Sequence, residues 1–383
     1  MEREILVRVR AALALTTTLL VVGCTSSNVG TGVTTVPSSS ATPMASPLAK
    51  PAQPVPPVMP VAKPRTNPPL AIVKPPIVAP QPREPEPIRG WVGIERWALS
   101  NRVGQLHLVW GGAQPKLELI APSGRLEFSV GSQFAKWNGL SFLLGFAPQI
   151  VAHEIAVNGL DIQKSFLPLI QQRAPTIRGR VIVIDPGHGG DQRGTKSIVG
   201  NKFEKDFTLD WALRLRTLLA SNGWTVYLTR TQDVDIPLHD RVAVADRVKA
   251  DLFLSLHFNA GGTGGAESGV ETYCMTPFAM PSNLTRGYVD DPYYNWPNNG
   301  FDRDNFTWAM RLHRSLMSAL TTADRGVRRA RFMAVLRTQR RPAVLIEGGY
   351  LSNRHEATLI NTPEYRQKLA QGVANAFPSL PKQ

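Results

Sequence analysis

Four titratable side chains at or near the ends of predicted strands are the residues of this sequence best suited to chemistry. His188 follows one strongly apolar run, His257 ends a second and Glu347 ends a third, while Glu204 stands just before a predicted helix. In an open α/β sheet, ligands bind in the crevice beyond the carboxyl ends of the strands. We therefore expect the four side chains to converge on one crevice.

The residue types indicate which chemistry that crevice would support. Two imidazoles and one carboxylate around an open fourth position form a catalytic zinc arrangement, which water or substrate completes. A second carboxylate beside that water would serve as a general base. Taken singly, each residue also has a structural interpretation: a turn at 185–187, a hydrogen-bonded histidine at 257, and a helix cap at a glutamate after a strand. Their joint placement, with glycines that let backbone approach a ligand, favours a functional site.

The elements that would position these residues alternate between strands and helices from Arg180 onward. Near-continuous apolar character predicts buried strands of a sheet covered on both faces at 181–184, 225–228, 252–256 and 343–346. Apolar residues at helical spacing predict three helices. The first contains Phe207, Trp211, Leu215 and Leu218 and ends at Gly223, and the second contains Phe306, Met310, Leu316 and Leu320. The last begins at Thr362-Pro363. The fold class is therefore α/β, with a mostly parallel sheet flanked by helices.

A different pattern fills residues 90–175, ahead of the α/β domain that we place at 178–383. Short runs of alternating apolar and polar residues at 105–109, 116–120 and 125–130 are separated by turn signals. Such runs are typical of half-buried strands. The sequence therefore predicts a small β-rich domain in front of the α/β domain, and its role stays open.

Several motifs of the α/β region resemble one family of enzymes. They are "VIVIDPGHGG", "FEKD", "DLFLSLHFNA" followed by "GVETY", and "RPAVLIEGGYLSN", with supporting matches around Arg230 and Arg241 and at 324–337. In this order and at these separations they resemble the zinc-dependent N-acetylmuramoyl-L-alanine amidases, over about residues 180–377. The resemblance implies a peptidoglycan hydrolase that cleaves the amide between N-acetylmuramic acid and L-alanine.

The same resemblance assigns roles to the four residues. It implies that His188, Glu204 and His257 are ligands of a Zn²⁺ cofactor and that Glu347 is the catalytic carboxylate. The expected partners are the glycan strands and stem peptides of peptidoglycan, with a protein activator as a further possibility.

The N-terminus has the features of an exported lipoprotein. A basic start and a short apolar run make residues 1–23 a predicted signal peptide, and the cysteine that follows, Cys24, resembles the lipidated residue of a bacterial lipobox. Thr25, rather than aspartate, then favours the periplasmic face of the outer membrane. Residues 24–89 hold 17 of the 32 prolines and predict a disordered, extended tether from a lipid anchor in the membrane.

Composition and charge exclude several other classes of protein. Two cysteines cannot build a disulfide framework, and the sequence has no apolar run of 18 residues that would span a membrane. The net charge of +14 and the crowding of six arginines between Arg328 and Arg341 would suit a nucleic-acid reader. Export places polyanionic envelope components within reach instead, so we expect no nucleic-acid partner.

One segment departs from the family pattern. Residues 275–305 form an insertion-like loop rich in aromatic residues, Pro, Asn and Gly. Three interpretations stay open: a lid or glycan-contacting wall over the crevice, an ordered surface loop that packs on itself, or a self-inhibitory segment. Cys274, directly before the loop, is expected to be buried and inert.

Two other functions compete with amidase activity. A catalytically silent, peptidoglycan-binding lipoprotein would tether the envelope to the cell wall, although the presence of all four site residues argues against it. A peptidase acting on stem peptides would keep the zinc but change the bond that is cleaved.

Overall fold

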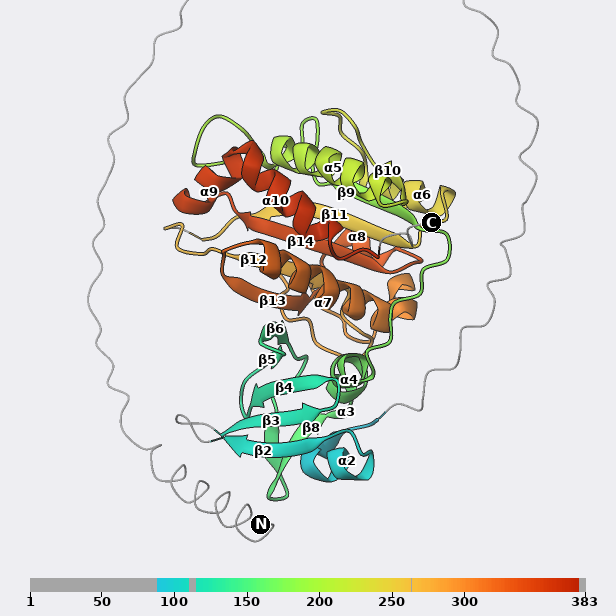
Figure 1. The fold of residues 1–383 in the computed structure, drawn as a ribbon, viewed down its shortest axis with the longest axis vertical. Helices are drawn as coiled ribbons and strands as arrows, with labels where there is room; N and C mark the ends of the chain where they lie inside the picture. The colour runs from blue at the N-terminus through green and yellow to red at the C-terminus, as the bar shows by residue number, and fades with distance from the viewer. Residues whose placement is uncertain (1–87, 110–114, 263, 379–383) are drawn as a thin grey trace, which may run out of the picture. The chain divides into compact units, whose positions relative to one another are not determined.

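The computed structural model describes residues 88–109, 115–262 and 264–378, which belong to one compact unit (Figure 1). The predicted signal peptide, Cys24 and nearly all of the predicted tether lie outside these residues. Among the described residues, no helix has both the length and the apolar character needed to cross a membrane.

The α/β region is built on a mixed sheet whose strands follow the order β10-β9-β11-β14-β12-β13. These strands are β9 (Val181–Pro186), β10 (Thr225–Leu228), β11 (Leu252–Asn259), β12 (Val270–Cys274), β13 (Asp324–Arg329) and β14 (Ala343–Tyr350). Neighbours pair in parallel except at β12 and β14, which are antiparallel. The expected α/β fold with a mostly parallel sheet is confirmed.

Helices cover both faces of this sheet, which explains the apolar strands. The helices are α5 (Glu204–Ser221), α6 (Leu238–Arg247), η2 (Pro297–Phe301), α7 (Asp302–Ala319), α8 (Ala334–Arg337), α9 (Arg354–Asn361) and α10 (Pro363–Ala374). Successive residues of β11 alternate between two apolar cores, since Leu254 packs with α5, α7 and α10 while Phe253 packs with α6 and α8. Figure 1 shows α5 and α10 on the same face.

The β-rich region contains a meander that follows the predicted alternation. Its strands are β2 (Gln105–Val109), β3 (Lys116–Ala121), β4 (Gly124–Ser129), β5 (Phe134–Trp137) and β6 (Leu140–Leu143), all antiparallel, and β6 pairs with β13 through Phe142 and Val327. A smaller sheet joins β1 (Trp91–Gly93), β8 (Glu154–Asn158) and β7 (Gln149–Val151). Short helical segments complete it: α2 (Ile94–Ser100), α3 (Gly159–Asp161), η1 (Ile162–Phe166) and α4 (Leu167–Gln171). The domain boundary near residue 176 stays a prediction.

Two details of the expected strand ends were wrong. The strands β11 and β14 continue past His257 and Glu347 to Asn259 and Tyr350, so both residues lie inside strands rather than at their ends. Glu204 does not precede the helix but is its first residue. His257 and Glu347 can lie inside strands because the hydrogen bonds of a sheet join backbone groups and do not depend on the side chain.

Candidate active site

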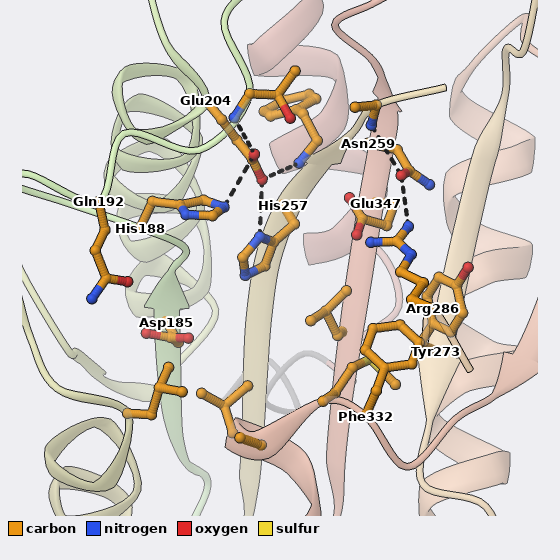
Figure 2. A pocket seen from close by; sticks show the side chains of 18 of the residues that line it. Asp185, His188, Gln192, Glu204, His257, Asn259, Tyr273, Arg286, Phe332 and Glu347 are labelled. Atoms are coloured by element: carbon orange, nitrogen blue, oxygen red, sulfur yellow. Dashed lines mark hydrogen bonds and ion pairs between the residues drawn. The ribbon is translucent and has the colours of Figure 1, made fainter. Parts of the chain in front are cut away.

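Glu204 lies at the centre of the site, between the two histidines (Figure 2). Its Oε2 lies 3.1 Å from Nε2 of His188 and its Oε1 lies 2.9 Å from Nδ1 of His257. The carboxylate also accepts backbone N–H bonds from Thr195 and Phe258, at 3.0 Å each. Burial opposes ionisation of Glu204, but the hydrogen bonds with the histidines outweigh it and lower its pKa. The structure therefore brings together the three predicted metal ligands.

The spacing of these donor atoms fits a metal ion. One donor atom from each of His188, Glu204 and His257 lies within 4.8 Å of the other two. Ligands of a tetrahedral zinc ion at about 2.0–2.1 Å lie about 3.3 Å from one another. The contacts of 3.1 and 2.9 Å that join Glu204 to the two imidazoles are close to this separation. Two imidazoles with one carboxylate are also the donor set of catalytic zinc sites. The residues present thus fit zinc.

A strained turn delivers His188 to the site. The residue follows β9 with φ of 61°, in the left-handed region that non-glycine residues rarely adopt. Arg241 donates from Nη2 to the His188 carbonyl at 2.8 Å, and Arg230 donates from Nε to the Pro186 carbonyl at 3.0 Å and from Nη2 to the Gly187 carbonyl at 2.9 Å. Two buried guanidinium groups therefore hold the turn in its strained conformation.

Asp185 ties the same turn to the sheet. Its buried carboxylate accepts hydrogen bonds from Thr229 Oγ1 at 2.6 Å and from Ser255 Oγ at 2.8 Å, and it pairs with Nη1 of Arg241 at 2.9 Å. The carboxylate is thus satisfied by three different elements. We assign Asp185 a positioning role for the loop that carries His188.

Two glycines leave the space that the side chains of His257 and Glu204 fill. A Cβ added to Gly187 would lie 2.3 Å from Cε1 of His257, and a Cβ added to Gly194 would lie 2.6 Å from Oε2 of Glu204. Real Cβ atoms do not approach other heavy atoms so closely. The sequence indicated glycines near a ligand site, and the structure shows which ones the close packing requires.

Glu347 lies beside this group on the neighbouring strand. It is directly opposite His257 in the parallel pairing of β14 with β11, and its side chain lies at the cleft (Figure 2). Its Oε2 is buried and has no hydrogen-bond partner among the described residues. Burial, together with the nearby carboxylates of Glu204 and Glu271, raises the pKa of Glu347 well above its ordinary value, although the positive charge of Arg286 opposes this rise. An unpaired buried carboxylate beside three converging donors is the arrangement expected of a general base.

The cleft that holds these groups has a volume of about 340 Å³. Its wall beyond Glu347 includes Asn259, Tyr273, Arg286 and Phe332, none of which the sequence interpretation singled out. Arg286 belongs to the loop 275–305, and its Nη2 donates to Asn259 Oδ1 at 2.8 Å. A lone arginine in an aromatic-rich loop carried no sequence signal that would have identified it.

The loop 275–305 otherwise packs against the segment after β13. Arg331 pairs with Asp290 at 2.9 Å, and the Arg337 guanidinium lies over the ring of Trp296, 4.6 Å from its centroid. Among the described residues, Arg286 is the one member of this loop that lines the cleft. The structure therefore shows a packed loop with one side chain in the cleft, and the lid and inhibitor interpretations stay predictions.

Burial changes the interpretation of the arginine cluster and bears out that of Cys274. Arg329 and Arg331 are 1% and 0% exposed and donate hydrogen bonds to carbonyl or carboxylate oxygens, so this stretch is not a continuous basic surface.

Cys274 is fully buried, and burial raises the pKa of its thiol to about 11. The thiol is therefore protonated at neutral pH, as expected of an inert cysteine.

Comparison with known proteins adds independent findings. A family model described as N-acetylmuramoyl-L-alanine amidase matches residues 182–378. A sporulation-specific N-acetylmuramoyl-L-alanine amidase of Bacillus subtilis (strain 168) is 36% identical over 199 residues, covering 51% of this chain and 66% of that protein. The germination-specific N-acetylmuramoyl-L-alanine amidase of the same strain is 30% identical over 253 residues, which cover 62% of this chain and 91% of that protein. Among solved structures, the catalytic domain of an amidase from Bacillus (Paenibacillus) polymyxa var. colistinus is 32% identical, covers 51% of this chain and 94% of that chain, and superposes with a TM-score of 0.42.

Proposed function

The chain belongs to the N-acetylmuramoyl-L-alanine amidase family, and on this premise we propose that it hydrolyses the amide between the lactyl group of N-acetylmuramic acid and L-alanine in peptidoglycan. The observation that carries the proposal is the convergence of His188, Glu204 and His257 in one cleft, next to the unpaired carboxylate of Glu347. A protein that only bound the cell wall would not need this quartet of residues.

The proposed cofactor is zinc, which His188, Glu204 and His257 would hold. When bound, a zinc ion supplies Lewis-acid chemistry, because it lowers the pKa of water and polarises a carbonyl. The lowered pKa of Glu204 keeps its carboxylate ionised, which a metal ligand requires. Its two backbone N–H bonds fix the carboxylate before any metal arrives.

Glu347 would move the proton that the reaction requires. It takes a proton from the attacking water as the water adds to the scissile carbonyl, and it then gives this proton to the departing L-alanine nitrogen. Breaking the amide leaves a carboxylate on the lactyl group and a free amine on the stem peptide. The raised pKa of Glu347 suits this role, since the carboxylate must accept a proton and hold it until the nitrogen departs.

Digestion of purified sacculi by the zinc-loaded full chain tests this function. Mass analysis should find released stem peptides that begin at L-alanine, and these should be absent from a parallel digest with Glu347→Gln. Fragments cut within the stem peptide would instead establish a peptidase. No release from sacculi or soluble muropeptides by the zinc-bound protein, with or without an envelope extract as a source of activator, would favour the wall-binding alternative.

We further propose that the chain is exported and lipidated at Cys24, which would anchor it to the envelope, at the periplasmic face of the outer membrane. The support is the short apolar run before Gly23-Cys24 and the proline-rich stretch after it. Radiolabelled palmitate should label the wild type but not Cys24→Ser, and fractionation should find the label in outer membranes. Equal labelling of both proteins would contradict lipidation at this cysteine.

A further inference from the structure

Arg286 occupies a distinctive place in the cleft wall. Figure 2 shows its guanidinium beside Glu347, on the side away from His188. The residue has a φ of 47°, and its guanidinium carbon lies 5.3 Å from the ring centroid of Phe332. An exposed loop arginine is therefore aimed into the site and supported from one side by an aromatic ring.

A relay of hydrogen bonds from the sheet sets the direction of this guanidinium. Asn259 on β11 accepts from Arg286 through Oδ1 and donates through Nδ2 to Oε2 of Glu271, at 3.0 Å. Because an ionised Glu271 can only accept, the Asn259 amide has one orientation, with its oxygen toward Arg286. Glu271 is itself fixed by hydroxyl groups of Tyr273 and Tyr350, at 2.6 and 3.0 Å. Residues of the sheet thus hold the side chain of one surface arginine in a fixed orientation.

The charge of Arg286 takes part in no ion pair among the described residues, although it lies close enough to Glu347 to oppose the rise in the pKa of that carboxylate. Of the described residues, two arginines line the cleft, and one of them, Arg241, is buried in an ion pair with Asp185. Within the described ranges, no carboxylate forms an ion pair with Arg286, whereas Arg331 is paired with Asp290 of the same loop. A cation that is held in position without an ion-pair partner can bind an anionic group of a ligand.

We propose that Arg286 binds a carboxylate of the stem peptide and so determines which peptides are cleaved. This inference rests on the proposed amidase function. The N-acetylated glycan is uncharged where the peptide is attached, whereas the stem peptide carries carboxylates. Glu347 gives its proton to the departing nitrogen, so the stem peptide extends past Glu347, and Arg286 lies there. The nearest candidate is the free α-carboxylate of the γ-linked D-glutamate that follows L-alanine.

Two substrates that differ at this carboxylate test the inference. They are N-acetylmuramoyl-L-alanyl-D-glutamate and its D-isoglutamine counterpart, in which the carboxylate is an uncharged amide. We expect the wild type to prefer the acid by roughly 10- to 100-fold in kcat/KM. Arg286→Gln should abolish this preference, in addition to any change in rate that both substrates share through the nearby Glu347, and Arg286→Lys should keep part of the preference. Arg340→Gln, which removes an equal charge from an exposed position outside the cleft, should behave as wild type.

A binding measurement separates failure of this inference from failure of the proposed activity. Calorimetric titration with the dipeptide L-alanyl-γ-D-glutamate should show binding to the wild type that weakens about 10-fold or more in Arg286→Gln, with unchanged zinc content. An equal loss of rate on both substrates would overturn the inference and leave the amidase function standing. Binding that depends on Arg286 without any cleavage would support the inference and contradict the activity. Neither cleavage nor binding would overturn both.

Discussion

Glu347 and His257 lie directly opposite each other on the parallel strands β14 and β11. On the other side of β14, Glu271 of β12 lies opposite the same Glu347. Residues in register on neighbouring strands project from one face of a sheet, so the proposed general base lies in a row between a proposed metal ligand and the residue that fixes Asn259 against Arg286. Ladder hydrogen bonds, rather than loops, fix the backbone that carries Glu347.

The first prediction separates metal binding from proton transfer. Glu347→Gln should retain one zinc ion per chain and lose activity by about 10²- to 10⁴-fold, because the amide cannot accept the proton. His188→Ala should lose both zinc and activity. Zinc content by elemental analysis and release of stem peptides are the two measurements. Substantial hydrolysis by Glu347→Gln would remove this residue from its assigned role.

The second prediction concerns the space at Gly187. Since its added Cβ would lie 2.3 Å from the His257 ring, Gly187→Ala should displace the imidazole and weaken zinc binding by about 10- to 100-fold. Gly300→Ala is the matched control, because a Cβ there meets no atom within 4 Å. Competition with a chelator of known affinity measures both. Unchanged zinc affinity in Gly187→Ala would show that the site relaxes around the methyl group.

The third prediction addresses the buried clamp on the His188 turn. Arg241→Gln should destabilise the fold by about 3 kcal/mol, since it leaves the Asp185 carboxylate without its ion-pair partner. It should also weaken zinc binding, because the guanidinium no longer holds the His188 carbonyl. Arg247→Gln, at the exposed end of the same helix α6, should change stability by less than about 0.5 kcal/mol. If urea denaturation found equal stabilities for the two variants, Arg241 would not stabilise the turn that carries His188.

Much of the fold could be predicted because burial leaves a clear trace in sequence. The strands β9, β10, β11 and β14 are apolar on successive residues, since helices cover both faces of the sheet. The start of α10 could also be predicted from the sequence, because Thr362 caps the helix and Pro363 occupies its first turn. Among the site residues, convergence of strand-associated His257 and Glu347 followed from the parallel topology.

What the sequence could not show depends on long-range contacts. The helix α2 was missed because a seven-residue segment has too few turns for a periodic pattern. Arg329 looks like a surface residue in sequence, yet its guanidinium donates to Ser165 and to the Lys164 carbonyl, far away in the chain. Arg286 gains its role from Asn259, 27 positions earlier, through a contact that no local spacing encodes.

The last prediction is a pH dependence of stability at the junction of β13, β6 and α7. Burial opposes ionisation of Asp324, but hydrogen bonds with His313 and the Ser141 N–H, at 2.9 and 2.8 Å, outweigh it and hold its pKa at about 2. A carboxylate with a lowered pKa stabilises the fold fully above its ordinary value of 3.8, and this contribution is lost as the pH falls toward 2. The wild type should therefore exceed Asp324→Asn in unfolding free energy by roughly 2 kcal/mol at pH 6, and urea titrations should show the gap closing between about pH 4 and pH 2. A gap that stays constant across this range would mean that the ionised carboxylate contributes nothing to the junction.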